Sequence, residues 1–152
     1  EREEGTMENV LQCKLFPAHL LENLKYVVVC SWYKGQWLFS RKKGSDAWET
    51  QGGHIEPGET PEQAARRELY EESGVQDAAL YYVCDYMGYD AFGFANGAVF
   101  FADVNALGAL PESEMEEAKL FDSLPEKLAY PRVTPVLLEK IYEVMYSLPD
   151  NT

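Results

Sequence analysis

The feature that most constrains this chain is the run Gly53–Val75, in which carboxylates recur behind a glycine-rich loop. Within it, Glu68, Glu71 and Glu72 stand at positions i, i+3 and i+4, so an α-helix places all three on one face. Neighbouring carboxylates repel one another, which raises their pKa values and weakens the helix. A divalent cation removes this conflict, and oxygen ligands suit Mg²⁺ or Mn²⁺. We therefore expect a metal site that serves hydrolysis of a charged, phosphorylated substrate.

Local signals place these carboxylates on a helix with defined ends. Thr60 is a suitable N-cap, Pro61 suits the first helical position, and Gln63 completes a capping box. The helix is predicted to end near Ser73, because Gly74 can adopt the positive φ of a helix C-cap.

The flanking segments predict a mixed sheet with helices on both sides, which is an α/β fold. An apolar run at 26–33 and its partner at 37–41 form a hairpin across a Lys-Gly turn. Further strands are predicted at 48–50, 79–89, 97–104 and 118–121, with a glycine- and aromatic-rich turn between the two long ones. A last helix begins at Thr134.

The run resembles the Nudix box, the signature of the Nudix hydrolases. Every defined position of that pattern is filled, by Gly53, Glu59, Arg67, Glu68, Leu69, Glu71, Glu72, Gly74 and Val75. The resemblance implies an α/β/α sandwich with a mixed sheet. We expect one such domain over residues 25–148, after an N-terminal segment 1–24 and before a tail 149–152.

The resemblance also implies roles for the residues of the box. Glu71 and Glu72 are then the principal metal ligands, and Glu68 is either a ligand or the group that activates water. The carbonyl of Gly52 completes the inner shell, because glycine lets the backbone approach an ion closely. Arg67 orients the carboxylates through a bidentate pair.

Further carboxylates lie outside the helix. Glu56 in the preceding loop is a weaker ligand candidate, which we assign to the substrate side of the site. Relatives often use a distal carboxylate as ligand or general base, and the acidic loop 111–117 offers several. We favour Glu114 as the catalytic one, followed by Glu117, while a merely solvated loop is the alternative.

Three other side chains are candidates for substrate binding. In similar enzymes a basic residue at the position of Arg41 meets substrate phosphate, and the alternative is a surface charge. Lys42 beside it is expected to be solvated. Tyr86 and Phe92 could stack on a base, although aromatic residues in strands more often belong to the core.

Composition limits the partners and the compartment. The 152 residues carry a net charge of −13, which repels nucleic-acid backbones and anionic membranes. We therefore expect a small phosphorylated substrate, no long nucleic acid and no membrane partner. Three cysteines without ligand-like spacing fit a reducing cytoplasm. Met7 offers an alternative start, in which case residues 1–6 are left from expression. Because many relatives form dimers, a homodimer is an open alternative.

The expected reaction is attack of water on phosphorus in a pyrophosphate bond, within a nucleoside di- or triphosphate or a related nucleoside diphosphate derivative. Oxidised dGTP is one such substrate. Relatives often carry proline where this chain has Gln51, which weakens transfer of a substrate from them. The alternatives are an RNA 5′-end pyrophosphohydrolase, an enzyme on a non-nucleotide diphosphate such as an isoprenoid diphosphate, and a noncatalytic ligand-sensing domain.

Overall fold

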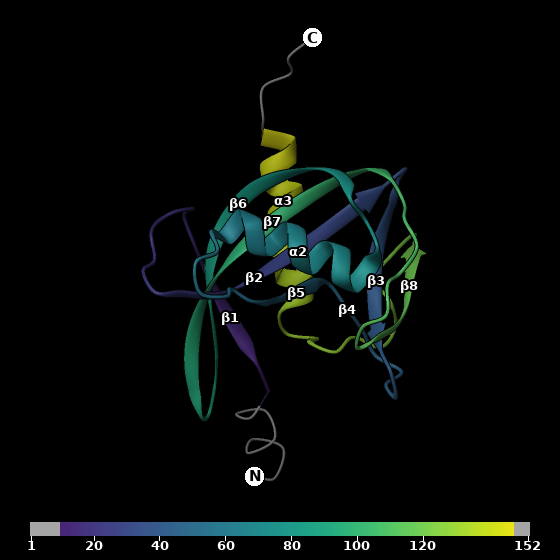
Figure 1. The fold of residues 1–152 in the computed structure, drawn as a ribbon. Coiled ribbons are helices and arrows are strands. Elements are labelled where there is room, and N and C mark those ends of the chain that lie inside the picture. Colours follow the sequence, from purple (N-terminus) through teal and green to yellow (C-terminus); the bar gives the residue numbers. More distant parts are fainter. Residues whose placement is uncertain (1–9, 148–152) are drawn as a thin grey trace.

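Two helices cover opposite faces of one mixed β-sheet in the computed structural model, which describes residues 10–147 (Figure 1). The α/β/α architecture is therefore confirmed. The strands are β1 Gln12–Phe16, β2 Leu24–Tyr33, β3 Gln36–Lys42, β4 Trp48–Glu49, β5 Gln51–His54, β6 Asp77–Asp90, β7 Gly93–Ala106 and β8 Met115–Phe121. The helices are α2 Pro61–Ser73 and α3 Thr134–Ser147. Neither of these helices is long and apolar enough to cross a membrane.

Strand β2 is the hub of the sheet. It runs parallel to β7 and antiparallel to β3 and β5. The path through the sheet is β1-β6-β7-β2-β3-β4, with β5 paired to β2 and β8 paired to β3. This pairing brings Gly52 and Gly53 of β5 opposite Val28 and Val27, directly before the loop that leads into α2.

Alternation along β2 divides the core into two clusters. Successive side chains of a strand point to opposite faces, so Val29 packs in the cluster with α2, and Cys30 packs in the cluster with α3. On the α2 side the helix contributes Leu69, which is 2% exposed. On the other side α3 contributes Leu137 and Ile141, each 1% exposed. The sheet is thereby held from both faces.

The predicted ends of α2 are confirmed. Thr60 and Gln63 form the capping box, and Gly74 closes the helix at φ 84° while its N–H donates to the carbonyl of Tyr70. Glycine is needed there for close approach as well, because a Cβ on Gly74 would lie 2.3 Å from the carbonyl oxygen of Ala109.

The two long strands, β6 and β7, are longer than predicted. The segment expected to be a wide turn between the two long strands continues their pairing, with Tyr89 opposite Phe94, and only two residues separate β6 from β7. Strand β8 also begins earlier, at Met115. The glycines that suggested a turn lie within the paired strands, because cross-strand pairing outweighs their weak local preference.

Strand β1 lies within the segment 1–24, where the sequence predicts no strand. It pairs antiparallel with β6, with Leu15 opposite Tyr86. Five residues carry too little pattern to be recognised alone, and the pairing depends on a partner far along the chain. Residues 1–6 and 149–152 lie outside the described residues.

A buried hydrogen-bond network joins three strands to the helix that carries the carboxylates. Gln51 is fully buried; its side chain accepts from the Ser31 hydroxyl and donates to the Leu38 carbonyl and the Ser40 hydroxyl. The Ser40 hydroxyl in turn donates to the backbone carbonyl of Glu72 at 2.7 Å. The glutamine that replaces the proline common among relatives therefore anchors the end of α2.

We predict that Gln51→Ala lowers the free energy of unfolding by about 2–4 kcal/mol, because the buried Ser31 hydroxyl and the Leu38 carbonyl lose their partner and Ser40 loses one of its two hydrogen bonds. Urea unfolding monitored by tryptophan fluorescence measures this change. Gln76→Ala is the matched control, since Gln76 is exposed and should change stability by less than about 0.5 kcal/mol. Equal effects of the two substitutions would contradict the anchoring role of Gln51.

Candidate metal and substrate site

Two glycines let carboxylates of α2 contact the backbone of β5. The N–H of Gly52 donates to Oε1 of Glu72 at 2.9 Å. A Cβ on Gly53 would lie 2.2 Å from Oε2 of Glu68, so that carboxylate occupies the space which any larger residue would fill. Gly53 is therefore required by the close approach of α2, whereas a Cβ on Gly52 would lie 2.4 Å from the carbonyl oxygen of Val27 on β2.

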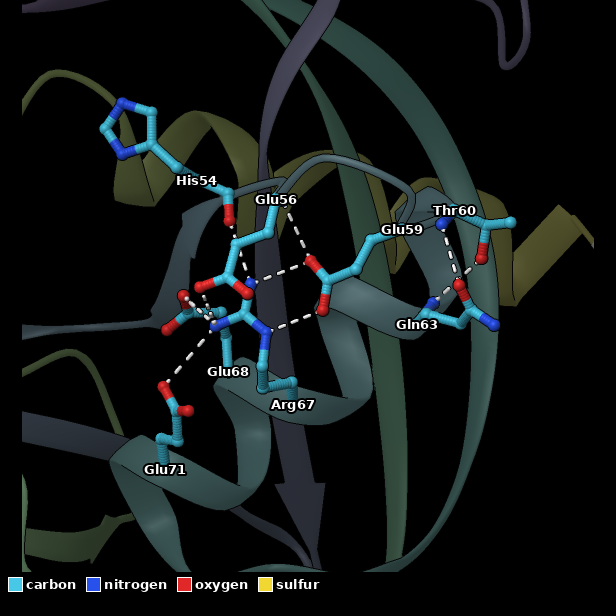
Figure 2. A network of polar contacts seen from close by, with 8 residues as sticks. All are labelled: His54, Glu56, Glu59, Thr60, Gln63, Arg67, Glu68 and Glu71. Atoms are coloured by element: carbon cyan, nitrogen blue, oxygen red, sulfur yellow. Dashed lines mark hydrogen bonds and ion pairs between the residues drawn. The ribbon is translucent and has the colours of Figure 1, made fainter.

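Arg67 ties the loop between β5 and α2 to the helix (Figure 2). Its guanidinium forms a bidentate pair with Glu59, at 2.6 and 2.9 Å, and donates to the carbonyl of His54 at 2.9 Å. The remaining nitrogen donates to Glu68 at 2.9 Å and reaches Glu71 at 3.4 Å. One cation thus fixes the loop and balances part of the acidic cluster.

The carboxylates experience different environments. Hydrogen bonds from Arg67 lower the pKa of Glu59 to about 2. Burial raises the pKa of Glu68, and Arg67 opposes this shift. Glu72 is only 4% exposed, and burial raises its pKa to about 9 despite the hydrogen bond from Gly52. Repulsion from neighbouring carboxylates, Glu68 first, adds to that shift.

The donor set fits a hard divalent cation. Carboxylate oxygens of Glu68, Glu71 and Glu72 and the carbonyl of Gly52 are the ligand types that Mg²⁺ and Mn²⁺ prefer. Within residues 10–147, no three potential metal ligands are yet gathered around one point, because Glu68 and Glu71 turn toward Arg67. Among the residues that the structure describes, no cation pairs with Glu72, and its buried carboxylate is the strongest indication of a metal position.

A cavity of about 350 Å³ opens beside Glu72. Apolar and aromatic side chains form much of its wall, including Tyr26, Tyr86, Leu137 and the exposed Tyr130. Polar side chains also line it, among them Lys42, Glu49, Gln51 and Glu114. An apolar cavity with a few convergent polar groups is the usual form of a small-molecule site.

The structure brings some of the predicted site residues to this cavity. Gly52, Glu72, Glu114 and Tyr86 line it, while Glu68 and Glu71 lie nearby on α2. Glu114 is adjacent to Glu72 and contributes to the raised pKa of that residue. Tyr86 is only 3% exposed, so it forms part of the wall and of the core together.

Other predicted residues lie elsewhere. Arg41 does not line the cavity, since it donates to the carbonyl of Ser45 at 2.8 Å and pairs with Glu117 at 3.1 Å. Phe92 is 85% exposed between β6 and β7, at the end of the hairpin that projects from the sheet (Figure 1). Glu56 lies 3.8 Å from Arg67 and likewise does not line the cavity.

Lys42, which was expected to be solvated, is partly exposed and lines the cavity that Arg41 does not reach. A β-bulge between Arg41 and Lys42 shifts the register against β8, so that Lys42 is opposite Met115. Successive side chains of a strand point to opposite faces, so Lys42 lines the cavity while Arg41 beside it does not. The extra residue of the bulge, Glu116, lies in β8 and leaves the alternation along β3 unbroken.

Glu49 and Tyr130 also line the cavity and were not among the predicted site residues. Glu49 is buried at the end of β4, and burial raises its pKa while Lys42 opposes the shift. Its position three residues before Gly52 is the one available sequence signal. Tyr130 comes from a segment distant in sequence, whose backbone pairs with Trp48 at Ala129.

Comparison with known proteins agrees with this geometry. The model of the NUDIX domain matches residues 24–135. The Bacillus subtilis protein YtkD, a proposed 8-oxo-dGTP diphosphatase, is 29% identical over 148 residues, which cover 90% of this chain and 92% of that protein. An RNA pyrophosphohydrolase from Photorhabdus laumondii is 49% identical over 49 residues. That alignment covers 32% of this chain and only 27% of the relative.

Among solved structures, the Bacillus subtilis pyrophosphohydrolase BsRppH superposes with a TM-score of 0.75 at 26% identity. The superposition covers 88% of this chain and 90% of that one. The family model spans most of the described sheet and the whole of α2. The chain therefore belongs to the Nudix hydrolase superfamily.

Proposed function

We propose that this protein hydrolyses a pyrophosphate bond in a nucleoside di- or triphosphate or a related nucleoside diphosphate derivative, oxidised dGTP among them, with Mg²⁺ or Mn²⁺. The observation that carries this proposal is the buried carboxylate of Glu72, which forms no ion pair within residues 10–147 and lines a cavity of about 350 Å³. The names of the relatives support the reaction class.

Each residue near the cavity has a distinct task in this proposal. Glu68, Glu71 and Glu72 would hold the cation, which supplies charge neutralisation at phosphate and acidifies water when bound. Arg67 keeps the helix and the loop in one arrangement by its bidentate pair with Glu59. Glu114 lies at the cavity wall, where its carboxylate can accept the proton of the attacking water.

An RNA 5′ end is the second candidate substrate. The local identity to RNA pyrophosphohydrolases and the superposition on BsRppH favour it. The net charge of −13 disfavours contact with a long phosphate backbone, so a small nucleotide is the first candidate. A cytoplasmic location and a homodimer stay predictions.

The direct test is product release from a panel of nucleoside triphosphates, nucleotide sugars, isoprenyl diphosphates and a short triphosphorylated RNA. We expect Mg²⁺-dependent release of phosphate or pyrophosphate from nucleotides, and none with excess chelator. Faster turnover of the RNA than of any free nucleotide would favour the second candidate. No product release from any substrate of the panel, or full activity in excess chelator, would overturn the proposal.

We predict that Glu72→Gln lowers kcat by at least about 100-fold while the fold persists, because the amide can still accept the hydrogen bond of Gly52 but binds a cation poorly. The metal-free variant should be at least as stable as the wild type, because the amide is neutral at every pH, whereas burying Glu72 requires that its carboxyl group take up a proton. Circular dichroism and thermal unfolding measure this. Activity near the wild-type level would exclude Glu72 as a ligand.

A pH dependence of stability follows from the raised pKa of Glu72. In the metal-free protein the folded state holds this proton up to about pH 9, whereas an unfolded glutamate loses it near pH 4.5. The free energy of unfolding should therefore fall as pH rises through this window. Melting temperatures in chelator should show the trend, and it should be weaker in Glu72→Gln. An identical trend in both proteins would assign it to other groups.

A further inference from the structure

Glu49 differs from the other buried carboxylates of the described residues. Asp85 accepts hydrogen bonds from two backbone N–H groups and from Tyr82, Glu68 pairs with Arg67, and Glu72 accepts from Gly52. Glu49 is 9% exposed, yet within residues 10–147 its carboxylate accepts no hydrogen bond and forms no ion pair. A buried carboxylate without a partner is costly and calls for an explanation.

The carboxylate of Glu49 opens into the cavity. Glu49 lines that space, and among the described residues no side-chain oxygen is both sealed from solvent and without a partner. Its Cα is opposite Ser40 on the neighbouring strand, so the backbone position is fixed by the sheet. The residue is thus presented to a ligand by a rigid element and does not lie on a mobile loop.

Lys42 presents a positive charge to the same space. Its ammonium group forms no hydrogen bond or ion pair within residues 10–147, although Glu49 is the charge that influences it most. The two groups therefore lie at one cavity, too far apart to neutralise each other directly. Together they offer a ligand one set of donors and one pair of acceptor oxygens.

We propose that Glu49 and Lys42 read the base of the substrate and select guanine. The Watson–Crick edge of guanine carries an acceptor, O6, beside two donors, N1–H and the exocyclic amine. Lys42 can donate to O6, while the two oxygens of Glu49 accept from the neighbouring donors, as carboxylates do with two parallel N–H groups. This inference rests on the proposed nucleotide hydrolysis and narrows its substrate class.

Other bases match this pair less well. Adenine carries an amine beside a ring acceptor, and cytosine carries an amine followed by two acceptors. In either base, a ring acceptor would face the carboxylate of Glu49, or an amine donor would face the ammonium group of Lys42. Uracil and thymine place a carbonyl where guanine has its amine. The oxidised base 8-oxoguanine keeps the Watson–Crick edge of guanine, so Glu49 and Lys42 do not discriminate between guanine and 8-oxoguanine.

The test compares kcat/KM for dGTP, 8-oxo-dGTP, dITP and dATP in the wild type and in Glu49→Gln. The base of dITP lacks only the exocyclic amine, so it isolates one contact of Glu49. We expect the wild type to prefer dGTP or 8-oxo-dGTP over dITP and dATP by about tenfold or more. In Glu49→Gln the advantage over dITP should disappear, because one acceptor oxygen is replaced by a donor.

Two further variants make the comparison decisive. Glu143→Gln makes the same exchange at an exposed residue of α3, paired with Lys140, and should keep the wild-type preferences. Lys42→Met should lower kcat/KM for dGTP and for dITP by a similar factor relative to dATP, because guanine and hypoxanthine both carry O6. If Glu49→Gln unfolds, the Lys42→Met result alone decides the inference.

Several outcomes would overturn the inference while the proposed function stands. One is equal turnover of all four nucleotides by the wild type. Another is that Glu49→Gln loses activity on all four nucleotides to the same degree, which would assign Glu49 to the reaction itself. An unchanged ratio of dGTP to dITP in a folded Glu49→Gln would have the same effect. If wild-type protein with Mg²⁺ hydrolyses no nucleotide at all, the proposed function fails first.

Discussion

The repulsion among carboxylates that one helix and one loop bring together governs the architecture of this site. Arg67 offsets most of this repulsion, because its guanidinium pairs with Glu59, Glu68 and Glu71. It also donates a hydrogen bond to the carbonyl of His54 (Figure 2). Glu72 is beyond its reach and is buried against Gly52. Within residues 10–147 no side-chain cation pairs with this carboxyl group, so it keeps its proton unless a metal ion replaces it, which is the physical reason to expect a metal there.

The sheet positions these carboxylates beside the cavity. Strand β5 places two glycines beneath α2, and β2 fixes β5 by antiparallel pairing. Gln51 joins the same strand to its neighbours through buried hydrogen bonds and reaches the end of α2 through Ser40. The cavity then opens next to Glu72, so in the proposed function one rigid scaffold would set the positions of both the reacting phosphate and the base.

Much of the helix could be predicted from the sequence, because its signals are local. The capping box, the glycine after Ser73 and the spacing of the carboxylates all lie within one short run. The residues that line the cavity could not be predicted in the same way. Lys42 lines the cavity and its neighbour Arg41 does not, while Tyr130 comes from a distant segment. Contacts between segments far apart in sequence decide which of these side chains reach the cavity.

The most direct test of a metal at Glu72 is calorimetric titration with Mn²⁺ at pH 7.5 in two buffers of different ionisation enthalpy. Because Glu72 holds a proton in the metal-free protein, cation binding should release about one proton, and Glu72→Gln should abolish that release and weaken binding. Binding of equal affinity in both proteins, with no proton released by either, would contradict the account.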